Sequence, residues 1–227
     1  MRRSNDKRRC KAIRRVFVFF ITVIVFSIPF HVFDLAFGLE PKVIAAFGDS
    51  LTAGFGVPAD AAYPAQLNRR LLEAGYAFRV VNAGVSGETT AGGLRRVDWI
   101  LQKIRPDIVI LELGANDGLR GLDLRQMENN LTKMIERFHE KGVKVLLAGM
   151  KIPPNYGKAY SDAFEAVFPK LSDRHQIGLI PFFLDGVAAQ PHLNQADGIH
   201  PTADGYKVLV DRIWPIVKHY IDANGLN

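Results

Sequence analysis

Two short polar segments of the chain combine a serine with an aspartate and a histidine. Gly48-Asp49-Ser50-Leu51 follows an apolar run, and a serine on the tight turn between a strand and the next helix has its hydroxyl exposed. In Asp197-Gly198-Ile199-His200-Pro201, a carboxylate and an imidazole lie three residues apart. Within one turn, that spacing lets Asp197 hold the Nδ1–H of His200 while Nε2 faces outward, the orientation that a base for a serine needs. The two segments therefore contain the parts of an activated hydroxyl.

Two further polar segments supply hydrogen-bond donors. Gly84, in Asn82-Ala-Gly-Val-Ser-Gly, offers an unobstructed backbone N–H, and Asn116, in Leu113-Gly-Ala-Asn-Asp, offers a side-chain amide. Acyl transfer needs such donors aimed at the negative charge that develops on the substrate. Taken singly, each feature has a purely structural explanation: a strand-end serine caps a helix, an asparagine forms an Asx-turn, and Thr202 is an N-cap. The combination of four such segments favours catalysis.

Alternating apolar segments position these residues. Short β-branched or continuously apolar runs alternate with longer amphipathic ones, the pattern of βαβ units. We expect strands over 43–47, 78–82, 108–113, 143–148 and 179–181, and helices over 63–74, 94–104, 124–141, 160–175 and 203–223. This order predicts an α/β fold, a doubly wound parallel sheet of the flavodoxin-like type with helices on both faces. Ligands bind such sheets at the carboxyl ends of the strands, where three of the four polar segments fall.

Glycines mark the ends of three predicted helices. Gly75, Gly142 and Gly178 each follow a helical segment, where a left-handed C-cap is expected. The chain has no linker-like or low-complexity stretch after residue 41, so we expect one catalytic domain over residues 39–227.

Composition excludes several classes of protein. The 227 residues are 48% hydrophobic and 23% charged, which rules out a disordered chain. Residues 1–15 carry eight basic side chains against one acidic, a net of +7, which leaves −1 of the formal +6 for the rest of the chain. A nucleic-acid-binding face therefore has little support. The single cysteine, Cys10, cannot form an internal disulfide.

Residues 1–38 have the parts of an export signal. A basic run precedes an uncharged apolar stretch over 16–28, and Ala36-Phe37-Gly38 fits a cleavage site after Gly38. Alternatively, residues 16–33 are near the length that spans a bilayer and are retained as an anchor. Arg14-Arg15 before the apolar stretch also matches a twin-arginine signal. Each interpretation predicts an exported domain, either periplasmic or secreted, or tethered to the inner membrane.

The four blocks together resemble the GDSL or SGNH hydrolase superfamily. Gly-Asp-Ser-Leu, a following Gly, Gly-x-Asn-Asp and Asp-x-x-His-Pro occur in that order between about Lys42 and Tyr220. The segments 82–90, 113–121 and 152–157 resemble its bacterial arylesterase branch, which includes acyl-CoA thioesterase I, also called lysophospholipase L1. The resemblance implies the SGNH hydrolase fold, a three-layer α/β/α sandwich with five parallel strands.

Roles follow from that resemblance residue by residue. It makes Ser50 the nucleophile, His200 its base and Asp197 the residue that orients His200. The N–H groups of Ser50 and Gly84 and the amide of Asn116 then form the oxyanion hole. Asp49 and Asp117, which flank these residues, are expected to brace their loops.

The segments around the site suggest an apolar acyl groove. Thr89, Leu119, Pro153 and Tyr156 stand in segments that should rim the site, and their neighbours are rich in Leu, Pro, Tyr and Gly. The resemblance implies aryl esters, fatty acyl thioesters or lysophospholipids as substrates and no cofactor. No set of histidines and acidic residues has metal-ligand spacing, so we expect no metal. A carbohydrate O-acetyl esterase and, in another class, a membrane-tethered binding module without catalysis are the alternatives.

Overall fold

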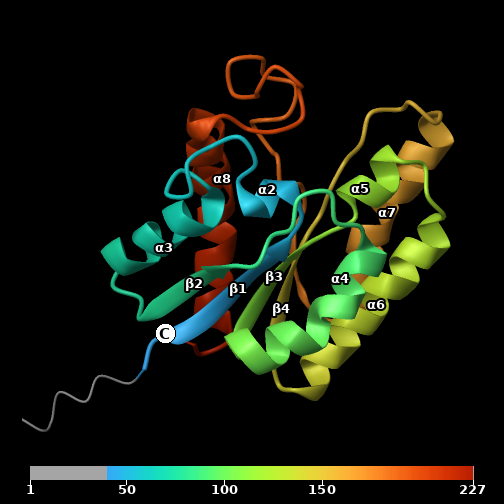
Figure 1. Ribbon diagram of the computed structural model, residues 1–227. Coiled ribbons are helices and arrows are strands. Elements are labelled where there is room, and N and C mark those ends of the chain that lie inside the picture. Colours follow the sequence, from blue (N-terminus) through green and yellow to red (C-terminus); the bar gives the residue numbers. More distant parts are fainter. Residues whose placement is uncertain (1–39, 227) are drawn as a thin grey trace, which may run out of the picture. The chain divides into compact units, whose positions relative to one another are not determined.

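A parallel sheet of five strands forms the centre of the protein. The computed structural model describes residues 40–226, so the export signal or anchor predicted for residues 1–38 lies outside the described residues. The strands lie in the order β2-β1-β3-β4-β5, and every neighbouring pair is parallel (Figure 1). They are β1 (Lys42–Gly48), β2 (Phe78–Asn82), β3 (Ile108–Glu112), β4 (Lys144–Ala148) and β5 (Gly178–Ile180). This order confirms the predicted flavodoxin-like α/β fold.

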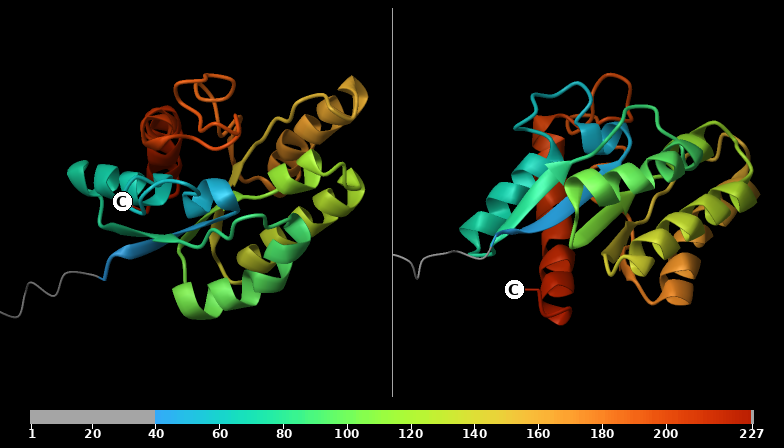
Figure 2. Two further views of the ribbon diagram at one scale, coloured as in Figure 1. Left: turned by 45° about the horizontal axis from the view of Figure 1, so that its top comes forward. Right: turned by 60° about the horizontal axis from the view of Figure 1, so that its bottom comes forward.

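Helices cover both faces of the sheet. α3 (Tyr63–Glu73) and α8 (Ala203–Ala223) pack together on one face. α4 (Thr90–Trp99), α6 (Leu124–Glu140) and α7 (Lys158–His175) cover the other (Figure 2). Because the chain leaves β1 towards β2 in one direction and later crosses to β3 in the other, right-handed connections place their helices on opposite faces. The change of direction beside β1 creates the switch point at which such folds bind ligands.

The central strands of the sheet are buried because helices cover both of its faces. All five residues of β3 are buried, and β1 is buried from Ile44 onward, as expected for central parallel strands. The edge strand β2 is fully buried only at Phe78. The largest completely buried side chains include Tyr63 of α3 and Tyr206 of α8. Burial of such aromatic side chains supplies much of the hydrophobic stabilisation.

Several boundaries differ from the expected ones. The helix predicted over 94–104 begins at Thr90 and continues from Trp99 into the π-helical turn η3 (Ile100–Ile104). Two short helices, α2 (Ser50–Ala53) and α5 (Ala115–Leu119), were not predicted, because single turns carry no apolar period.

Two of the three glycine caps are confirmed. Gly75 and Gly142 have positive φ angles of 83° and 73°. The prediction for Gly178 was wrong: Gln176 adopts the left-handed conformation with φ of 52°, and Gly178 begins β5. At Gly178 a Cβ atom would lie 2.5 Å from the Tyr220 ring, so this glycine allows close packing and not a turn.

Candidate active site

Ser50 lies at the carboxyl end of β1, as the first residue of α2. The Asp49 side chain caps this helix by accepting a hydrogen bond from the Leu51 N–H at 3.0 Å. Gly54 ends the helix in the left-handed conformation with φ of 79°. A turn this short holds the serine hydroxyl above the sheet edge, where the polar segments converge.

The structure brings Ser50, His200 and Asp197 into one continuous contact. His200 Nε2 lies 2.8 Å from Ser50 Oγ, and His200 Nδ1 lies 2.7 Å from Asp197 Oδ2. These distances place the imidazole between the hydroxyl and the carboxylate in the order that proton transfer from a serine requires.

A compact loop holds Asp197 and His200. Asp197 Oδ1 accepts hydrogen bonds from the N–H groups of Ile199 at 2.9 Å and His200 at 3.0 Å. These bonds, the one from His200 first, lower the pKa of Asp197 to about 2. Asp197 therefore stays ionised over the range in which a histidine titrates. Thr202 caps α8 by accepting the Gly205 N–H, as its position predicted.

Gln195 ties this loop to the segment that follows Ser50. Its side-chain Nε2 donates to the carbonyl oxygens of Phe55 at 2.7 Å and Pro201 at 3.0 Å, and its backbone N–H donates to the His200 carbonyl at 2.7 Å. The Phe55 ring packs against the His200 imidazole, with centroids 4.7 Å apart. No local sequence pattern pointed to Gln195, because its partners lie far along the chain or on the backbone.

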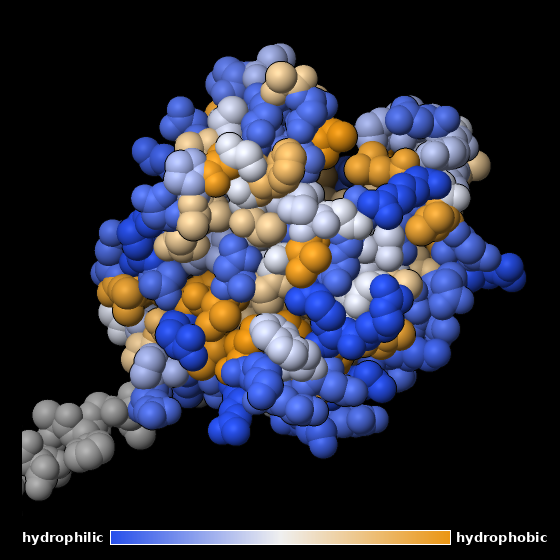
Figure 3. All heavy atoms as spheres, in the orientation of Figure 1, coloured by the Kyte–Doolittle hydropathy of each residue, from blue (hydrophilic) through white to orange (hydrophobic). Residues whose placement is uncertain are grey.

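Ser50 and His200 open into a cavity of about 220 Å³. Its walls combine the polar groups of the site with apolar side chains: Asp49, Ser50, Leu51, Phe55, Ser86, Gly87, Ala115, Asn116, Leu119, Ile199 and His200. In space-filling view this face of the molecule is hollowed, with hydrophobic side chains on both sides of the hollow (Figure 3). The cavity can therefore receive an apolar group beside a reacting centre at Ser50.

Of the four residues predicted to bind substrate, only Leu119 lines this cavity. Thr89 is the N-cap of α4, and Pro153 lies on an exposed loop. The Tyr156 side chain is 54% exposed, and its ring packs on Tyr160 with centroids 5.6 Å apart. Thr89, Pro153 and Tyr156 do not line the cavity. The prediction failed for them because sequence spacing can locate a segment but cannot give the direction of each side chain.

Gly84 does not reach the cavity. Its N–H donates to Asn82 Oδ1 at 3.0 Å, and a Cβ atom at Gly84 would lie 2.2 Å from the backbone nitrogen of Ala53. Gly84 thus lets the segment after β2 pack against α2, and the expectation that its N–H points at the site is corrected.

Gly87, three residues further on, lines the cavity instead. It occupies a turn closed by the hydrogen bond from the Glu88 N–H to the Val85 carbonyl at 3.1 Å, and its φ is +77°. Over residues 40–226, neither the Gly87 N–H nor the Ser50 N–H donates a hydrogen bond. Glycine at the third position of a type II turn was the available sequence signal.

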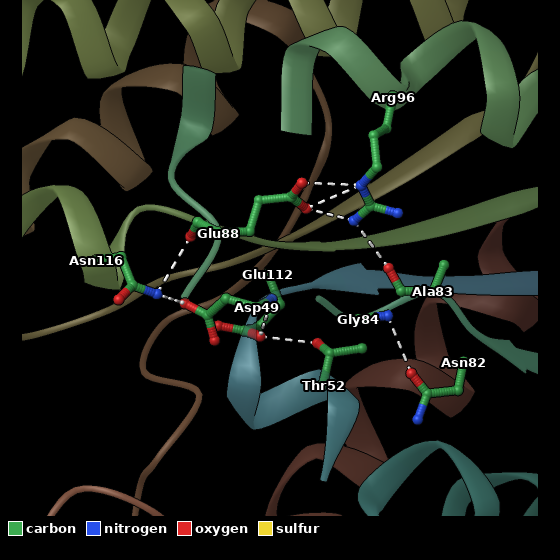
Figure 4. Close-up of polar contacts among 9 residues, drawn as sticks. All are labelled: Asp49, Thr52, Asn82, Ala83, Gly84, Glu88, Arg96, Glu112 and Asn116. Atoms are coloured by element: carbon green, nitrogen blue, oxygen red, sulfur yellow. Dashed lines mark hydrogen bonds and ion pairs between the residues drawn. The ribbon is translucent and has the colours of Figure 1, made fainter. Parts of the chain in front are cut away.

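The Asn116 side chain is fixed by groups from two other segments. Its Nδ2 donates to Asp49 Oδ2 at 2.9 Å and to the Glu88 carbonyl at 3.1 Å (Figure 4). Arg120, which is exposed, donates to the Asn116 Oδ1 at 3.3 Å and to the Gly87 carbonyl at 2.9 Å. The amide is therefore oriented before any substrate arrives.

Two buried carboxyl groups lie beneath the site. Glu112 Oε2 accepts a hydrogen bond from Thr52 Oγ1 at 2.7 Å, and the Asp49 N–H is 3.4 Å from the same oxygen (Figure 4). Burial raises the pKa of Asp49 to about 6 and the pKa of Glu112 well above its ordinary value. In the described part of the chain, Glu112 Oε1 and the Tyr63 hydroxyl are buried without a hydrogen-bond partner. A continuous polar cluster thus extends from Asn116 into the core.

Asp117 braces its loop, as expected. Its two carboxylate oxygens accept from the Thr90 N–H at 2.8 Å and the Thr90 hydroxyl at 2.6 Å, and Asn130 donates to that hydroxyl at 3.1 Å. Residues 40–226 contain no cluster of His, Cys, Asp and Glu side chains that could hold a metal ion. None of the helices within this range is long and apolar enough to cross a membrane.

Comparison with known proteins identifies the family. Residues 46–208 match the GDSL-like Lipase/Acylhydrolase family. The chain belongs to this family. It is 41% identical over 177 residues to Esterase TesA of Pseudomonas aeruginosa, with 78% of this chain and 88% of the relative covered. It is 39% identical over 176 residues to Thioesterase 1/protease 1/lysophospholipase L1 of Escherichia coli, with 76% and 83% covered.

A solved structure agrees with this assignment. The psychrotrophic esterase EstA from Pseudoalteromonas sp., in a crystal structure inhibited by monoethylphosphonate, is 32% identical, with a TM-score of 0.77. The alignment covers 80% of this chain and 99% of EstA. The fold and the four sequence blocks therefore belong to a GDSL-type hydrolase, as the resemblance implied.

Proposed function

We propose that this hydrolase cleaves carboxylic esters through an acyl-enzyme on Ser50. The observation that carries the proposal is the continuous contact from Asp197 through His200 to Ser50, with heavy-atom distances of 2.7 and 2.8 Å. A general base within hydrogen-bond reach of a serine hydroxyl, itself oriented by a carboxylate, is the arrangement of serine hydrolases.

The reaction follows from these contacts in two halves. Ser50 Oγ attacks the ester carbonyl carbon while His200 Nε2 takes the hydroxyl proton. The tetrahedral intermediate collapses, the carbon–oxygen bond to the alcohol breaks, and His200 returns the proton to the departing oxygen. Water then attacks the acyl-enzyme with His200 again as the base, which releases the acid and restores Ser50. Asp197 stabilises the imidazolium that forms in each half.

Three donors are available to the developing oxyanion. Ser50, in the first turn of α2, and Gly87 both line the cavity, and neither of their N–H groups has an acceptor among the described residues. Asn116 lines the same cavity. We assign the oxyanion hole to these groups, with Gly87 in the place expected for Gly84. Asn116 must share a hydrogen already donated to Asp49 or Glu88.

The cavity walls favour a small or medium acyl group. Leu51, Phe55, Leu119 and Ile199 supply apolar surface, and Phe55 and Ile199 are 50% and 45% exposed at the rim. A volume of about 220 Å³ is below the usual 300–1,000 Å³ of ligand pockets, so a longer chain must continue along the open surface. We propose acyl esters of lipid-like character as substrates. We include thioesters and lysophospholipids because the Escherichia coli relative is named a thioesterase and lysophospholipase.

A series of p-nitrophenyl esters from acetyl to palmitoyl tests the proposal. We expect hydrolysis by the full chain to peak at medium acyl groups, to fall for palmitoyl and to vanish in Ser50→Ala. Ser161→Ala, on the surface of α7, serves as the matched control and should keep wild-type activity. Activity on the acetyl ester alone would indicate a deacetylase instead, such as a carbohydrate O-acetyl esterase. Ester hydrolysis that persists in Ser50→Ala would refute the mechanism, and a folded, inactive wild type would favour the binding module.

We also propose that residues 1–38 direct the domain across the cytoplasmic membrane. The basic run and the apolar stretch of the sequence support this proposal. An exported enzyme would meet lipid esters more readily than cytosolic acyl-CoA. A reporter that is active only outside the cytoplasm, fused after Asn227, should be active, whereas activity of a cytoplasm-specific reporter would refute export.

A further inference from the structure

The segment between β2 and α4 carries two atoms on which the proposed oxyanion hole depends. Gly87 lines the cavity and its N–H has no acceptor among the described residues, and the carbonyl of Glu88 accepts the Asn116 amide at 3.1 Å. Its start is fixed to β1, because the Ala83 N–H donates to Ala46 at 2.8 Å and the Val85 N–H donates to Gly48 at 3.0 Å. Among residues 40–226, the end of the segment, at Glu88, has no such backbone hydrogen bond to the sheet.

The side chain of Arg96 supplies that restraint. From α4, its Nε donates to the two carboxylate oxygens of Glu88 at 2.8 and 3.1 Å, and its terminal nitrogen donates to the same carboxylate (Figure 4). The terminal nitrogen also donates to the Ala83 carbonyl at 3.0 Å. One guanidinium group thus joins both ends of the segment to α4.

The surroundings make this contact rigid. The Glu88 side chain is 8% exposed and that of Arg96 24% exposed, so solvent screens the pair little. The guanidinium carbon lies 4.9 Å from the centre of the Phe47 ring of β1, which restricts it on a third side. A planar fork can hold a carboxylate with two parallel bonds and still reach a carbonyl, whereas the ammonium of a lysine is a point charge on a flexible stem.

We infer that Arg96 is a positioning residue for the oxyanion hole: by clamping Glu88 and Ala83, it sets the places of the Gly87 N–H and the Asn116 amide. The inference rests on the proposed function, since it concerns donors of that same site. Arg96 contacts no reacting atom and acts through Glu88. Its removal should therefore weaken the stabilisation of the transition state and leave the binding of the acyl group almost unchanged.

A double-mutant cycle in kcat tests this inference. Arg96→Met should lower kcat on a p-nitrophenyl ester by about 10–100-fold with KM within about twofold, and Asn116→Ala should lower kcat by about 10²–10³-fold. If Arg96 acts through the same donors, the double variant loses at least tenfold less than the product of the single losses. Arg96→Lys should recover only part of the loss. Arg95→Met is the matched control, because Arg95 is the exposed neighbour on α4 and makes no hydrogen bond within the described residues.

Two results would overturn the inference. A kcat of Arg96→Met equal to that of Arg95→Met would show that the clamp does not matter, and losses that multiply in the double variant would show a merely structural role. Thermal melts identify variants that do not fold; if Arg96→Met is among them, Arg96→Lys replaces it in the cycle with the same criteria. Ser50→Ala separates the two proposals: activity that depends on Ser50 but not on Arg96 refutes only the positioning role.

Discussion

Ser50 is flanked by two polar systems that the chain builds in different ways. On the base side, Asp197 and His200 are three residues apart, and their side chains are 38% and 17% exposed. On the oxyanion side, Asn116 contacts Asp49 and Glu88, which lie 67 and 28 residues away, and Asp49 is 1% exposed. One system is local and open to solvent, and the other is assembled from distant segments and buried.

Because of this difference, substitutions on the two sides should have different effects on the reaction rate and on the free energy of unfolding. A loop that satisfies its own backbone groups can lose a side chain without disturbing the core, since surface substitutions usually change stability by less than about 0.5 kcal/mol. A buried polar cluster leaves unsatisfied groups when one member is removed, at a cost of about 1–3 kcal/mol for each. Variants on the base side should therefore affect the rate alone, and variants on the oxyanion side should affect both the rate and the free energy of unfolding.

Asp197→Asn should have the largest effect. The Asn carbonyl oxygen can keep the bonds from the Ile199 and His200 N–H groups, but its amide group faces His200 Nδ1 and favours the wrong tautomer. We expect kcat to fall about 10⁴-fold with a nearly unchanged melting temperature. Asp162→Asn, on the exposed surface of α7, is the control. A large loss of stability in Asp197→Asn would contradict the local character of the base side.

Asn116→Ala should reduce both quantities. The oxyanion loses one donor, which costs about 10²–10³ in kcat, and the buried Asp49 carboxyl loses a hydrogen-bond partner, which costs about 1–3 kcal/mol of unfolding free energy. Kinetics and urea denaturation on the same preparation measure the two effects. Asn129→Ala, an exposed asparagine on α6, should change neither. Unaltered stability in Asn116→Ala would show that the two sides do not differ in this respect.

The same difference explains what the sequence could predict. Asp197 and His200 were recognisable because their geometry is set by a spacing of three residues, and the five strands because burial on both faces leaves continuous apolar runs. The prediction for Gly84 failed because the Asn82 side chain, two residues earlier, accepts the Gly84 N–H in an Asx-turn, a local hydrogen bond that competes with a role in the site. Glu112 reads as the end of an apolar strand, and its contacts with Thr52 and Asp49 exist only after β1 and β3 pair.

The pH dependence of stability should differ in sign between the two sides. Burial raises the pKa of Asp49 from 3.8 to about 6, so the native state binds more protons than the unfolded state between these values, and stability falls as the pH rises through this window. The pKa of Asp197 is lowered to about 2, so its contribution is present above about pH 4 and is lost as the pH falls towards 2. Solvent screening keeps this contribution small, because the side chain is 38% exposed.

Glu112→Gln tests the buried half of this prediction. Burial raises the pKa of Glu112 as well, and the negative charge of Asp49 raises it further. With one of the two carboxyl groups neutral, unfolding free energy from urea titrations should decline less between pH 4 and pH 7 than in the wild type. Glu136→Gln, an exposed residue of α6, should keep the wild-type slope. If the unfolding free energy of Glu112→Gln changed with pH as steeply as that of the wild type, the carboxyl pair Asp49–Glu112 would not cause the pH dependence of stability.

Gln195→Ala should have the smallest effect, and it tests how local the base side is. The Gln195 side chain joins the Asp197–His200 loop to the carbonyl of Phe55. A pair of hydrogen bonds near the surface contributes about 1 kcal/mol, so we expect kcat to fall about fivefold to tenfold. Gln190→Ala, whose side chain is exposed on the same loop, is the control. A loss close to that of Asp197→Asn would mean that the loop does not hold its own geometry. The base side would then depend on tertiary contacts as fully as the oxyanion side, because a three-residue spacing alone would not keep His200 within 2.8 Å of Ser50.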